Sequence, residues 1–441
     1  MAESDAMLFR AVKCFVNSYI AVADDGVKIP KALSYTEGES ARGAIVYNSD
    51  DTVTLYLSDF TITYDSANSQ LFIPSVAKAF AARVDGVNGM AALSEDSDET
   101  KMEILFGKCD REHFVACEEE LLFRDYYLCV KNNKLSVSAY SIYGYARAIE
   151  FLIDGFSSWG ITIPVSGYYG DDAYGNLYKN YENPSLDDAW MLNVAHRGDV
   201  TSNLNPENSL PSFTSCIDNC VDVIETDLKL TKDGVWVICH DTTLDRTTNG
   251  KGAISEMTYD EIKKYFLLTQ NGGSGASVTD YKVPTLEEVI DLCKGRVILN
   301  LDHLDPSYYQ EVYDVFEEKG AVNIAMFKGY WSASQLLEWY CKLISDGREL
   351  PLYMPMFYSP DKYIEDATPS FVGLTSIFES WAKHSSQTVQ TISDSNIRMM
   401  CLTALNPMLE NFEYYTELKE MGYTAIMTDT PCLLKEFIHG Y

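Results

Sequence analysis

The second half of the chain repeats one pattern, in which a short apolar run precedes a longer amphipathic segment. Eight such runs predict buried strands, at residues 192–195, 221–228, 297–302, 322–327, 352–356, 371–374, 397–403 and 424–427. Helical spacing fits between most of them, for example over residues 209–219, 285–294 and 306–318. Strands that alternate with helices indicate parallel pairing, and eight such units in about 250 residues predict a (β/α)8 barrel.

One interruption follows the second predicted strand. Residues 235–239 are apolar and short enough to form an extra hairpin arm, and residues 242–282 are a small excursion before the barrel pattern resumes. We therefore expect a barrel with a local insertion.

The first half has a different pattern, in which alternation of period two predicts a strand at residues 52–57. Residues 60–64 are predicted as another strand, and residues 126–131 and 134–139 as two strands separated by the turn Asn132-Asn133. Residues 75–83 and 142–154 have helical spacing. The fold class is therefore α/β, a (β/α)8 barrel preceded by a smaller α+β domain. We place this domain at residues 1–165, a tyrosine-rich linker at 166–190 and the barrel at 191–441.

The charge of the chain narrows the class of partner. The 441 residues carry a formal net charge of −31, with 46% hydrophobic and 22% charged residues. This excess of acid repels nucleic-acid backbones and anionic membranes, so we expect neither as a partner. A small anionic substrate remains compatible if the site carries a local cation.

The N-terminus and the cysteine spacing bear on localisation. Residues 1–19 lack a clean signal-peptide core, and no segment is long and apolar enough for stable membrane insertion. The 11 cysteines show no C-x-x-C spacing, which argues against a disulfide framework. We expect a cytoplasmic protein, although a secreted chain whose signal segment had been removed would look the same.

Candidate metal ligands stand where the predicted strands end. Active residues of such barrels gather at the carboxyl ends of the strands. Glu225 and Asp227 end the second strand and, two residues apart, point to the same face. Asp302 ends the third strand and adds another carboxylate. Oxygen ligands of this kind suit Mg²⁺ or Ca²⁺ better than zinc.

Two histidines complete the candidate site. His196 follows the first strand and His240 ends the extra arm, and the chain has only six histidines. A lone histidine is usually structural, and a Glu-x-Asp strand is a frequent accident, so the argument rests on their combination. A cation neutralises phosphate oxygens, and two imidazoles that titrate near neutral pH can move protons. The sequence therefore predicts a metal-dependent phosphodiesterase.

Longer motifs surround these residues. They are His-Arg-Gly at 196–198, Pro-Glu-Asn-Ser at 206–209, Glu-x-Asp at 225–227, His-Asp at 240–241, Leu-Asp-Arg-Thr-Thr-Asn-Gly at 244–250, Pro-Thr-Leu-Glu-Glu at 284–288 and Thr-Asp-Thr-Pro at 428–431. From residue 192 to the C-terminus the chain resembles the glycerophosphodiester phosphodiesterases. The resemblance implies a TIM barrel of the phosphatidylinositol-phospholipase type, one divalent cation (Ca²⁺ or Mg²⁺), and hydrolysis of glycerophosphodiesters to an alcohol and glycerol 3-phosphate.

The resemblance also implies a role for each residue. The cation would be held by Glu225, Asp227 and Asp302. His196 and His240 would be general acid and base, in an order that the sequence leaves open, while Arg197 would clamp the phosphate as a catalytic and substrate-binding group. Glu207 would hold Arg197 or a histidine in place. The nucleophile is either water or a neighbouring hydroxyl of the substrate.

Three positions depart from the family pattern. The third ligand is usually glutamate, where this chain has Asp302, and a lysine usually stands where it has Leu304. We hypothesise that Lys328, predicted just after the fourth strand, supplies the missing positive charge to the substrate. A tryptophan usual on the seventh strand is absent around residues 401–403.

The N-terminal half carries a second resemblance. Its motifs are Glu-Ile-x-x-Gly-x-x-x-Arg at 103–111, Asp-Tyr-x-x-x-Val-x-x-x-x-Leu-x-Val at 125–137 and Gly-x-x-x-Ala-Ile-x-Phe-Leu at 144–152. Residues 60–160 resemble the accessory domain found before the barrel in hexosaminidase-type enzymes. A packing module without its own ligand fits these motifs, and so does a domain that contacts a glycan.

Two alternative functions stay open at this point. The same site could act on a lysophospholipid, a sphingolipid or a glycan-linked phosphodiester. The departures at Asp302 and Leu304 also fit a catalytically inactive binding protein.

Overall fold

The computed structural model describes most of the chain. The described residues are 21–23, 26–28, 44–48, 51–57, 60–65, 70–88, 92–95, 102–107, 121, 123–156, 160–169, 191–201, 204–219, 221–358, 360–380, 383–404 and 406–439. Residues 42–441 form one compact unit. Residues 1–41 form another, of which the hairpin of β1 (Ala21–Ala23) and β2 (Gly26–Lys28) is described.

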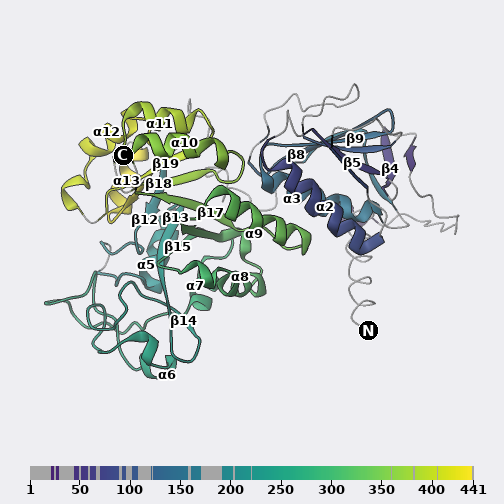
Figure 1. Ribbon diagram of the computed structural model, residues 1–441. Helices are drawn as coiled ribbons and strands as arrows, with labels where there is room; N and C mark the ends of the chain where they lie inside the picture. Colours follow the sequence, from purple (N-terminus) through teal and green to yellow (C-terminus); the bar gives the residue numbers. More distant parts are fainter. Residues whose placement is uncertain are drawn as a thin grey trace. The chain divides into compact units, whose positions relative to one another are not determined.

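Eight parallel strands close into a barrel in the second half of the chain (Figure 1, teal to yellow). They are β12 (Leu192–Ala195), β13 (Val223–Leu230), β15 (Ile298–Asp302), β16 (Ala325–Gly329), β17 (Leu352–Phe357), β18 (Ile377–Ser380), β19 (Arg398–Leu402) and β20 (Ala425–Thr428). Each pairs with its neighbours in chain order, and β12 pairs with both β13 and β20. The predicted (β/α)8 barrel is confirmed.

Helices follow the strands along the chain and surround them (Figure 1). They are α5 (Leu210–Asp218), α7 (Leu286–Cys293), α8 (Tyr309–Glu318), α9 (Ala333–Ser345), α10 (Asp361–Phe371), α11 (Ser386–Ser393), α12 (Phe412–Glu420) and α13 (Pro431–His439). Residues at the N-termini of these helices determine where the helices begin, as α7 illustrates. The hydroxyl of Thr285 accepts from the N–H of Glu288 at 3.2 Å, and the Glu288 carboxylate accepts from the N–H of Thr285 at 2.8 Å. This capping box satisfies backbone donors that have no partner within the helix.

The insertion after the second barrel strand is also confirmed. Strand β14 (Trp236–Ile238) pairs antiparallel with β13. The excursion beyond it contains the 3-10 helix η4 (Ile254–Glu256) and the short helix α6 (Tyr259–Ile262). Its apolar side chains build a small core of their own, made of Val237, Cys239, Leu244, Ile254, Ile262, Leu267 and Val283.

Two predicted barrel strands are corrected by the structure. The apolar run at residues 371–374 is not a strand: Phe371 ends α10, and Gly373 turns the chain with a φ of +76°. The sixth strand is β18, which begins at Ile377. Residues 322–327 do not form one strand, because residues 322–324 are the 3-10 helix η6 (Val322–Ile324). Strand β16 begins at Ala325 and ends at Gly329, beyond the predicted end, and it therefore contains Lys328. Apolar runs alone cannot separate a strand from a buried helix end.

Besides the β1–β2 hairpin, the described residues before the barrel form two sheets. One is antiparallel, with the order β10 (Ile161–Pro164), β4 (Thr52–Tyr56) and β3 (Ala44–Tyr47). The other has the order β11 (Ser166–Tyr169), β8 (Tyr126–Lys131), β9 (Lys134–Ala139), β7 (Glu103–Phe106), β5 (Thr61–Tyr64) and β6 (Ala92–Glu95). Helices α2 (Ile73–Asn88) and α3 (Ile142–Leu152) complete this α+β region (Figure 1).

Sequence predicted most of these elements. The strands near residues 52–57, 60–64, 126–131 and 134–139 and both helices are present. Residues 166–169, expected in the linker, instead form β11 and pair with β8. The rest of the predicted linker, from residue 170 to 190, lies outside the described residues. No helix in the described part of the chain combines the length and apolar character needed to cross a bilayer.

The buried strands of the barrel should dominate its stability. Leu299 on β15 is fully buried in the main hydrophobic core. We expect Leu299→Ala to lower the free energy of unfolding by about 2–5 kcal/mol, because it removes apolar contacts and leaves a cavity. Urea denaturation followed by tryptophan fluorescence measures the loss. The matched control is Leu71→Ala: Leu71 is 74% exposed, so the change should stay within about 0.5 kcal/mol. Equal losses in both variants would contradict this assignment of the core.

Candidate active site

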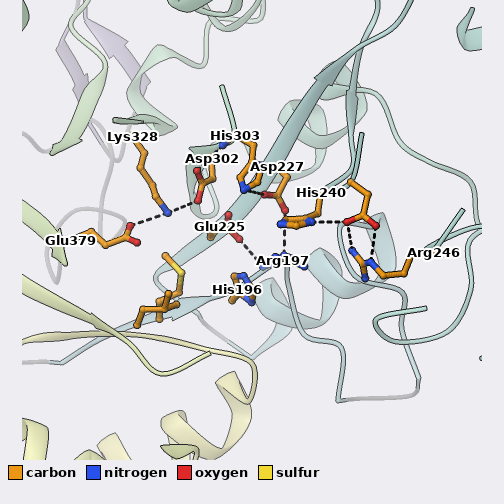
Figure 2. A pocket seen from close by; sticks show the side chains of 13 residues that line it. His196, Arg197, Glu225, Asp227, His240, Arg246, Asp302, His303, Lys328 and Glu379 are labelled. Carbon is orange, nitrogen blue, oxygen red and sulfur yellow. Dashed lines mark hydrogen bonds and ion pairs between the residues drawn. The ribbon is translucent and has the colours of Figure 1, made fainter. Parts of the chain in front are cut away.

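A cavity of about 310 Å³ lies where the carboxyl ends of the barrel strands meet the insertion (Figure 2). It is lined by His196, Arg197, Glu225, Asp227, His240, Asp241, Arg246, Asp302, His303, Lys328, Glu379, Leu402 and Met427. All of the predicted site residues except Glu207 line this cavity, and Glu207 contacts two of its arginines. The structure therefore brings the sequence-predicted residues together.

Three carboxylates form the acidic centre of the cavity. Glu225 and Asp227 point inward from β13, and Asp302 ends β15; one oxygen of each lies within 4.8 Å of the others. Glu225 and Asp227 are each only 1% exposed. Burial and the negative charges of Asp227 and Asp302 raise the pKa of Glu225 well above its ordinary value. Buried like charges at this spacing favour a cation between them, so this donor set fits a divalent metal ion.

The loop after β12 positions two of these carboxylates. The backbone N–H of Arg197 donates to Glu225 at 3.0 Å, in a left-handed backbone conformation with a φ of +56°. Asn208, also left-handed at +52°, donates from its amide to Asp227 at 2.8 Å. Its amide oxygen accepts from the hydroxyl of Thr226 at 3.1 Å, which fixes the orientation of the amide. The strained backbone thus holds the acidic centre in place.

His196 is buried beside the last barrel strand. Its Nδ1 lies 2.7 Å from a carboxylate oxygen of Asp429, in the Thr-Asp-Thr-Pro motif that follows β20. No group in the described part of the chain hydrogen-bonds to its Nε2. The carboxylate therefore favours the tautomer in which Nδ1 carries the proton and Nε2 presents a lone pair.

His240 is held by a similar contact on the insertion. Its Nδ1 lies 2.7 Å from Asp241, and Arg246 donates to the same carboxylate at 2.8 and 2.9 Å. Arg246 also makes two 2.8 Å hydrogen bonds to the buried Glu207. The hydrogen bonds from Arg246 hold the pKa of Asp241 well below its usual range, and those to Glu207 and Asp241 raise the pKa of Arg246. A chain of hydrogen bonds thus links Glu207 to His240 through Arg246 and Asp241.

The side chain of Arg197 is less available than expected. Its guanidinium lies 3.4 Å from Glu207 and 3.4 Å from Asp227, and its buried Nε has no hydrogen-bond partner among the described residues. Arg197 still lines the cavity, so the role of phosphate clamp remains a proposal. In this geometry its charge also offsets that of Asp227.

Lys328 reaches the cavity from within β16, not from the loop that follows it. Its ammonium lies 2.5 Å from Asp302 and 2.9 Å from Glu379, with only 1% of the side chain exposed. Burial alone would lower the pKa of Lys328, but the charges of Glu379 and Asp302 outweigh burial and raise it. Burial would raise the pKa of Asp302, yet the charge and hydrogen bond of Lys328 lower it. The amine therefore stays charged beside the acidic centre.

Several residues of the site were missed by sequence reasoning. Glu379 belongs to β18, the strand that the apolar pattern placed too early. His303 follows Asp302 directly and carried no signal of its own. The contacts of three further residues could have been suspected from the sequence. Asp241 stands next to His240, Arg246 belongs to the motif at 244–250, and Asp429 belongs to the motif at 428–431. Leu402 and Met427 form a wall of the cavity near the seventh strand, where the family tryptophan is absent.

Comparison with known proteins decides the family. The family model described as the glycerophosphoryl diester phosphodiesterase family matches residues 196–433, more than half of the chain. The chain belongs to this family. The matched residues begin at His196 and include every residue that lines the cavity.

Individual proteins with similar sequences carry the name of the same family. A glycerophosphodiester phosphodiesterase of Caldanaerobacter subterraneus is 44% identical over 108 residues, which is 24% of this chain and 42% of that protein. The chain thus matches less than half the length of this relative. One from Bacillus altitudinis is 33% identical over 39% of this chain and 70% of its own length. The crystal structure of a glycerophosphoryl diester phosphodiesterase from Parabacteroides distasonis has the same fold, with a TM-score of 0.50, 23% identity, and coverage of 60% of this chain and 92% of that one.

The acidic centre makes the metal-free protein sensitive to pH. A carboxyl whose pKa is raised on folding binds its proton more tightly when folded, so this contribution to stability declines as the pH rises above the ordinary value of 4.5. In chelator, we expect the melting temperature of the wild type to fall over this range towards neutral pH, and to fall less in Glu225→Gln. Mg²⁺ or Ca²⁺ should raise the melting temperature of the wild type more than that of the variant.

The matched control is the exposed Glu256, changed to glutamine. Calorimetry of the three proteins with chelator and with metal separates the effects. If Glu225→Gln and Glu256→Gln respond alike to pH and to metal, Glu225 does not belong to a cation site.

Proposed function

We propose that the chain hydrolyses glycerophosphodiesters to an alcohol and glycerol 3-phosphate, with one divalent cation and two histidines as acid and base. One observation carries this proposal: two histidines, each held through Nδ1 by a carboxylate at 2.7 Å, line the same cavity as the three-carboxylate centre. Membership of the phosphodiesterase family supports it.

The acidic centre supplies the ligands for the cation. Glu225, Asp227 and Asp302 would hold Mg²⁺ or Ca²⁺, since both ions prefer carboxylate oxygens. When bound, the ion neutralises anionic oxygens of the phosphate and makes the phosphorus more susceptible to attack. The same carboxylates repel an anionic phosphate while the ion is missing, so substrate binding should depend on metal.

The two imidazoles perform the proton transfers. Asp429 and Asp241 favour protonation at Nδ1 of His196 and His240, which leaves Nε2 of each ring for the reaction. One ring removes the proton from the attacking hydroxyl, and the other, as imidazolium, donates a proton to the leaving alkoxide. The paired carboxylate stabilises whichever ring becomes charged.

Lys328 places a positive charge beside Asp302, whereas Arg197 lies near Asp227. The buried ammonium of Lys328 offsets charge beside Asp302, in a chain that has Leu304 at the position of the family's usual lysine. We propose that this ammonium helps to neutralise the phosphate, together with Arg197. Its position within hydrogen-bonding distance of Asp302 and Glu379 supports a role at the reacting end of the cavity.

The first test is turnover on a panel of phosphodiesters. We expect release of glycerol 3-phosphate from glycerophosphodiesters with Mg²⁺ or Ca²⁺, and no release with chelator. His196→Ala and His240→Ala should each lower kcat by about 10²–10⁴-fold, because each removes one proton transfer. The kcat of the double variant should be little lower than that of the less active single variant, since the two proton transfers belong to one reaction.

Metal binding provides the control for these variants. Both histidine variants should keep the metal-induced rise in melting temperature, because neither residue belongs to the three-carboxylate centre. A panel that also includes a lysophospholipid, a sphingolipid and a glycan-linked diester identifies the substrate. Turnover of one of those instead of glycerophosphodiesters, or of none in a folded, metal-binding protein, would overturn the proposal.

A separate prediction concerns Lys328. We expect Lys328→Met to lower kcat/KM by about ten-fold or more, since a buried cation is lost beside the phosphate. The matched control, Lys362→Met on α10, removes an ammonium whose side chain is 81% exposed and should leave turnover unchanged. Because Lys328→Met also leaves two buried carboxylates without their cation, circular dichroism must first show that it folds. Intact turnover in a folded Lys328→Met variant would contradict the role.

A further inference from the structure

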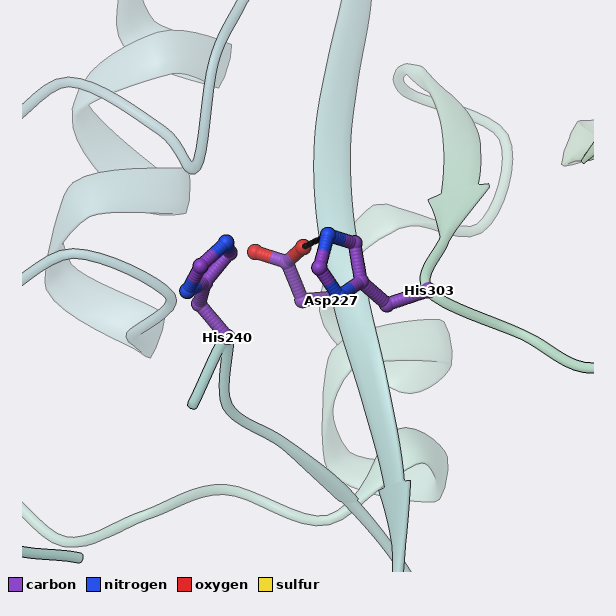
Figure 3. Close-up of side chains that lie close together, drawn as sticks. All are labelled: Asp227, His240 and His303. Carbon is purple, nitrogen blue, oxygen red and sulfur yellow. Dashed lines mark ion pairs between the residues drawn. The ribbon is translucent and has the colours of Figure 1, made fainter. Parts of the chain in front are cut away.

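A second group of potential metal ligands adjoins the three-carboxylate centre. It consists of Asp227, His240 and His303, each of which offers one ligand atom within 4.8 Å of the others. In Figure 3 the carboxylate of Asp227 lies between the two imidazole rings. The ring centroids of His240 and His303 are 4.6 Å apart. The chemistry of this group differs from that of its neighbour, because two of its three ligands are nitrogen.

The backbone directs His303 towards this position. His303 follows β15 in a left-handed conformation with a φ of +54°, and its N–H donates to Asp302 at 2.6 Å. Its Nε2 lies 3.9 Å from Asp227, on a side chain that is 44% exposed. A non-glycine residue held in this conformation is uncommon and often marks a functional site. Half-exposed, the ring has room to adjust to a ligand.

His240 is already prepared as a metal ligand. Metal-binding histidines usually donate their other ring N–H to a carboxylate, which fixes the tautomer and the ring orientation. Asp241 provides this contact at 2.7 Å, and Arg246 in turn holds Asp241 with two hydrogen bonds. Nε2 of His240 therefore presents its lone pair to the cavity.

We propose that Asp227, His240 and His303 form a second cation site, which takes a zinc-type transition-metal ion. Two imidazoles and one carboxylate are a common donor set for zinc, with water as the fourth ligand, whereas Mg²⁺ and Ca²⁺ prefer oxygen alone. Ligands about 2.0–2.1 Å from one ion lie within roughly 4 Å of each other. A small movement of the half-exposed His303 closes the present spacing.

The two sites share Asp227. Its Oδ2 accepts from Asn208 and lies near Arg197, while Oδ1 lies towards His303. A carboxylate between two cations can contribute one oxygen to each. Zinc at the second site would also take the lone pair of His240, the group that we propose for proton transfer. The second site is therefore inhibitory, and this consequence, unlike the binding itself, rests on the proposed function.

Binding is tested directly. The purified chain, saturated with Mg²⁺, is dialysed against Zn²⁺ and, separately, titrated with Co²⁺, whose visible absorption reports its coordination number. We expect one Zn²⁺ per chain and a low-coordinate Co²⁺ spectrum, and about ten-fold or greater weakening in His303→Ala. His303→Cys, which restores a zinc ligand, should regain binding, and Glu225→Gln should keep it. Equal Zn²⁺ affinity in the wild type and His303→Ala, or no binding to the wild type, would overturn the site.

Inhibition is a separate measurement. With activity in Mg²⁺ alone as the reference for each protein, Zn²⁺ should inhibit the wild type at concentrations about ten-fold or more below those that inhibit His303→Ala. Zinc that binds through His303 without inhibiting would overturn the inhibitory role and leave the site standing. If the wild type hydrolyses no diester, dialysis and the Co²⁺ spectrum still decide the site, so this failure is distinguishable from failure of the proposed function.

Discussion

The rest of the site is arranged around three carboxylates that repel one another, two of them buried and the third partly buried. Glu225 and Asp227 lie within β13 and Asp302 ends the adjacent β15, and one oxygen of each lies within 4.8 Å of the others. Such an arrangement is unfavourable for folding unless positive charge is brought close. Lys328 offsets part of the charge from one side and Arg197 from the other, and a divalent cation would offset the remainder.

The surrounding contacts keep this arrangement rigid. Each candidate histidine is held by a carboxylate: Asp429, which follows the last strand, contacts His196, and Asp241, the neighbour of His240 on the insertion, contacts His240. The barrel therefore supplies the three carboxylates, whereas the insertion supplies one of the two rings and its support. Such sites benefit from side chains whose positions are fixed before the substrate arrives.

Sequence predicted the barrel and the centre of the site because both leave local signals. Eight apolar runs indicated eight strands, and motifs marked the residues from His196 to His240. Glu379 escaped because two apolar runs stand close together, and the choice between them depends on which one packs as a strand. His303 escaped for another reason: its role depends on a backbone turn and on spatial neighbours, neither of which has a sequence pattern.

Arg246 joins the loop after β12 to two separate parts of the insertion. It contacts Glu207 and Asp241, donates to the carbonyl of Asn271 at 2.6 Å, and its own carbonyl accepts from Gly273 at 2.7 Å. The glycine-containing loop at 271–275 is thus tied to the support of His240. Cleavage of this loop by a protease would remove contacts that hold Arg246 and would loosen the alignment of the His240 imidazole. The chain would then keep its fold while this ring lost its fixed position.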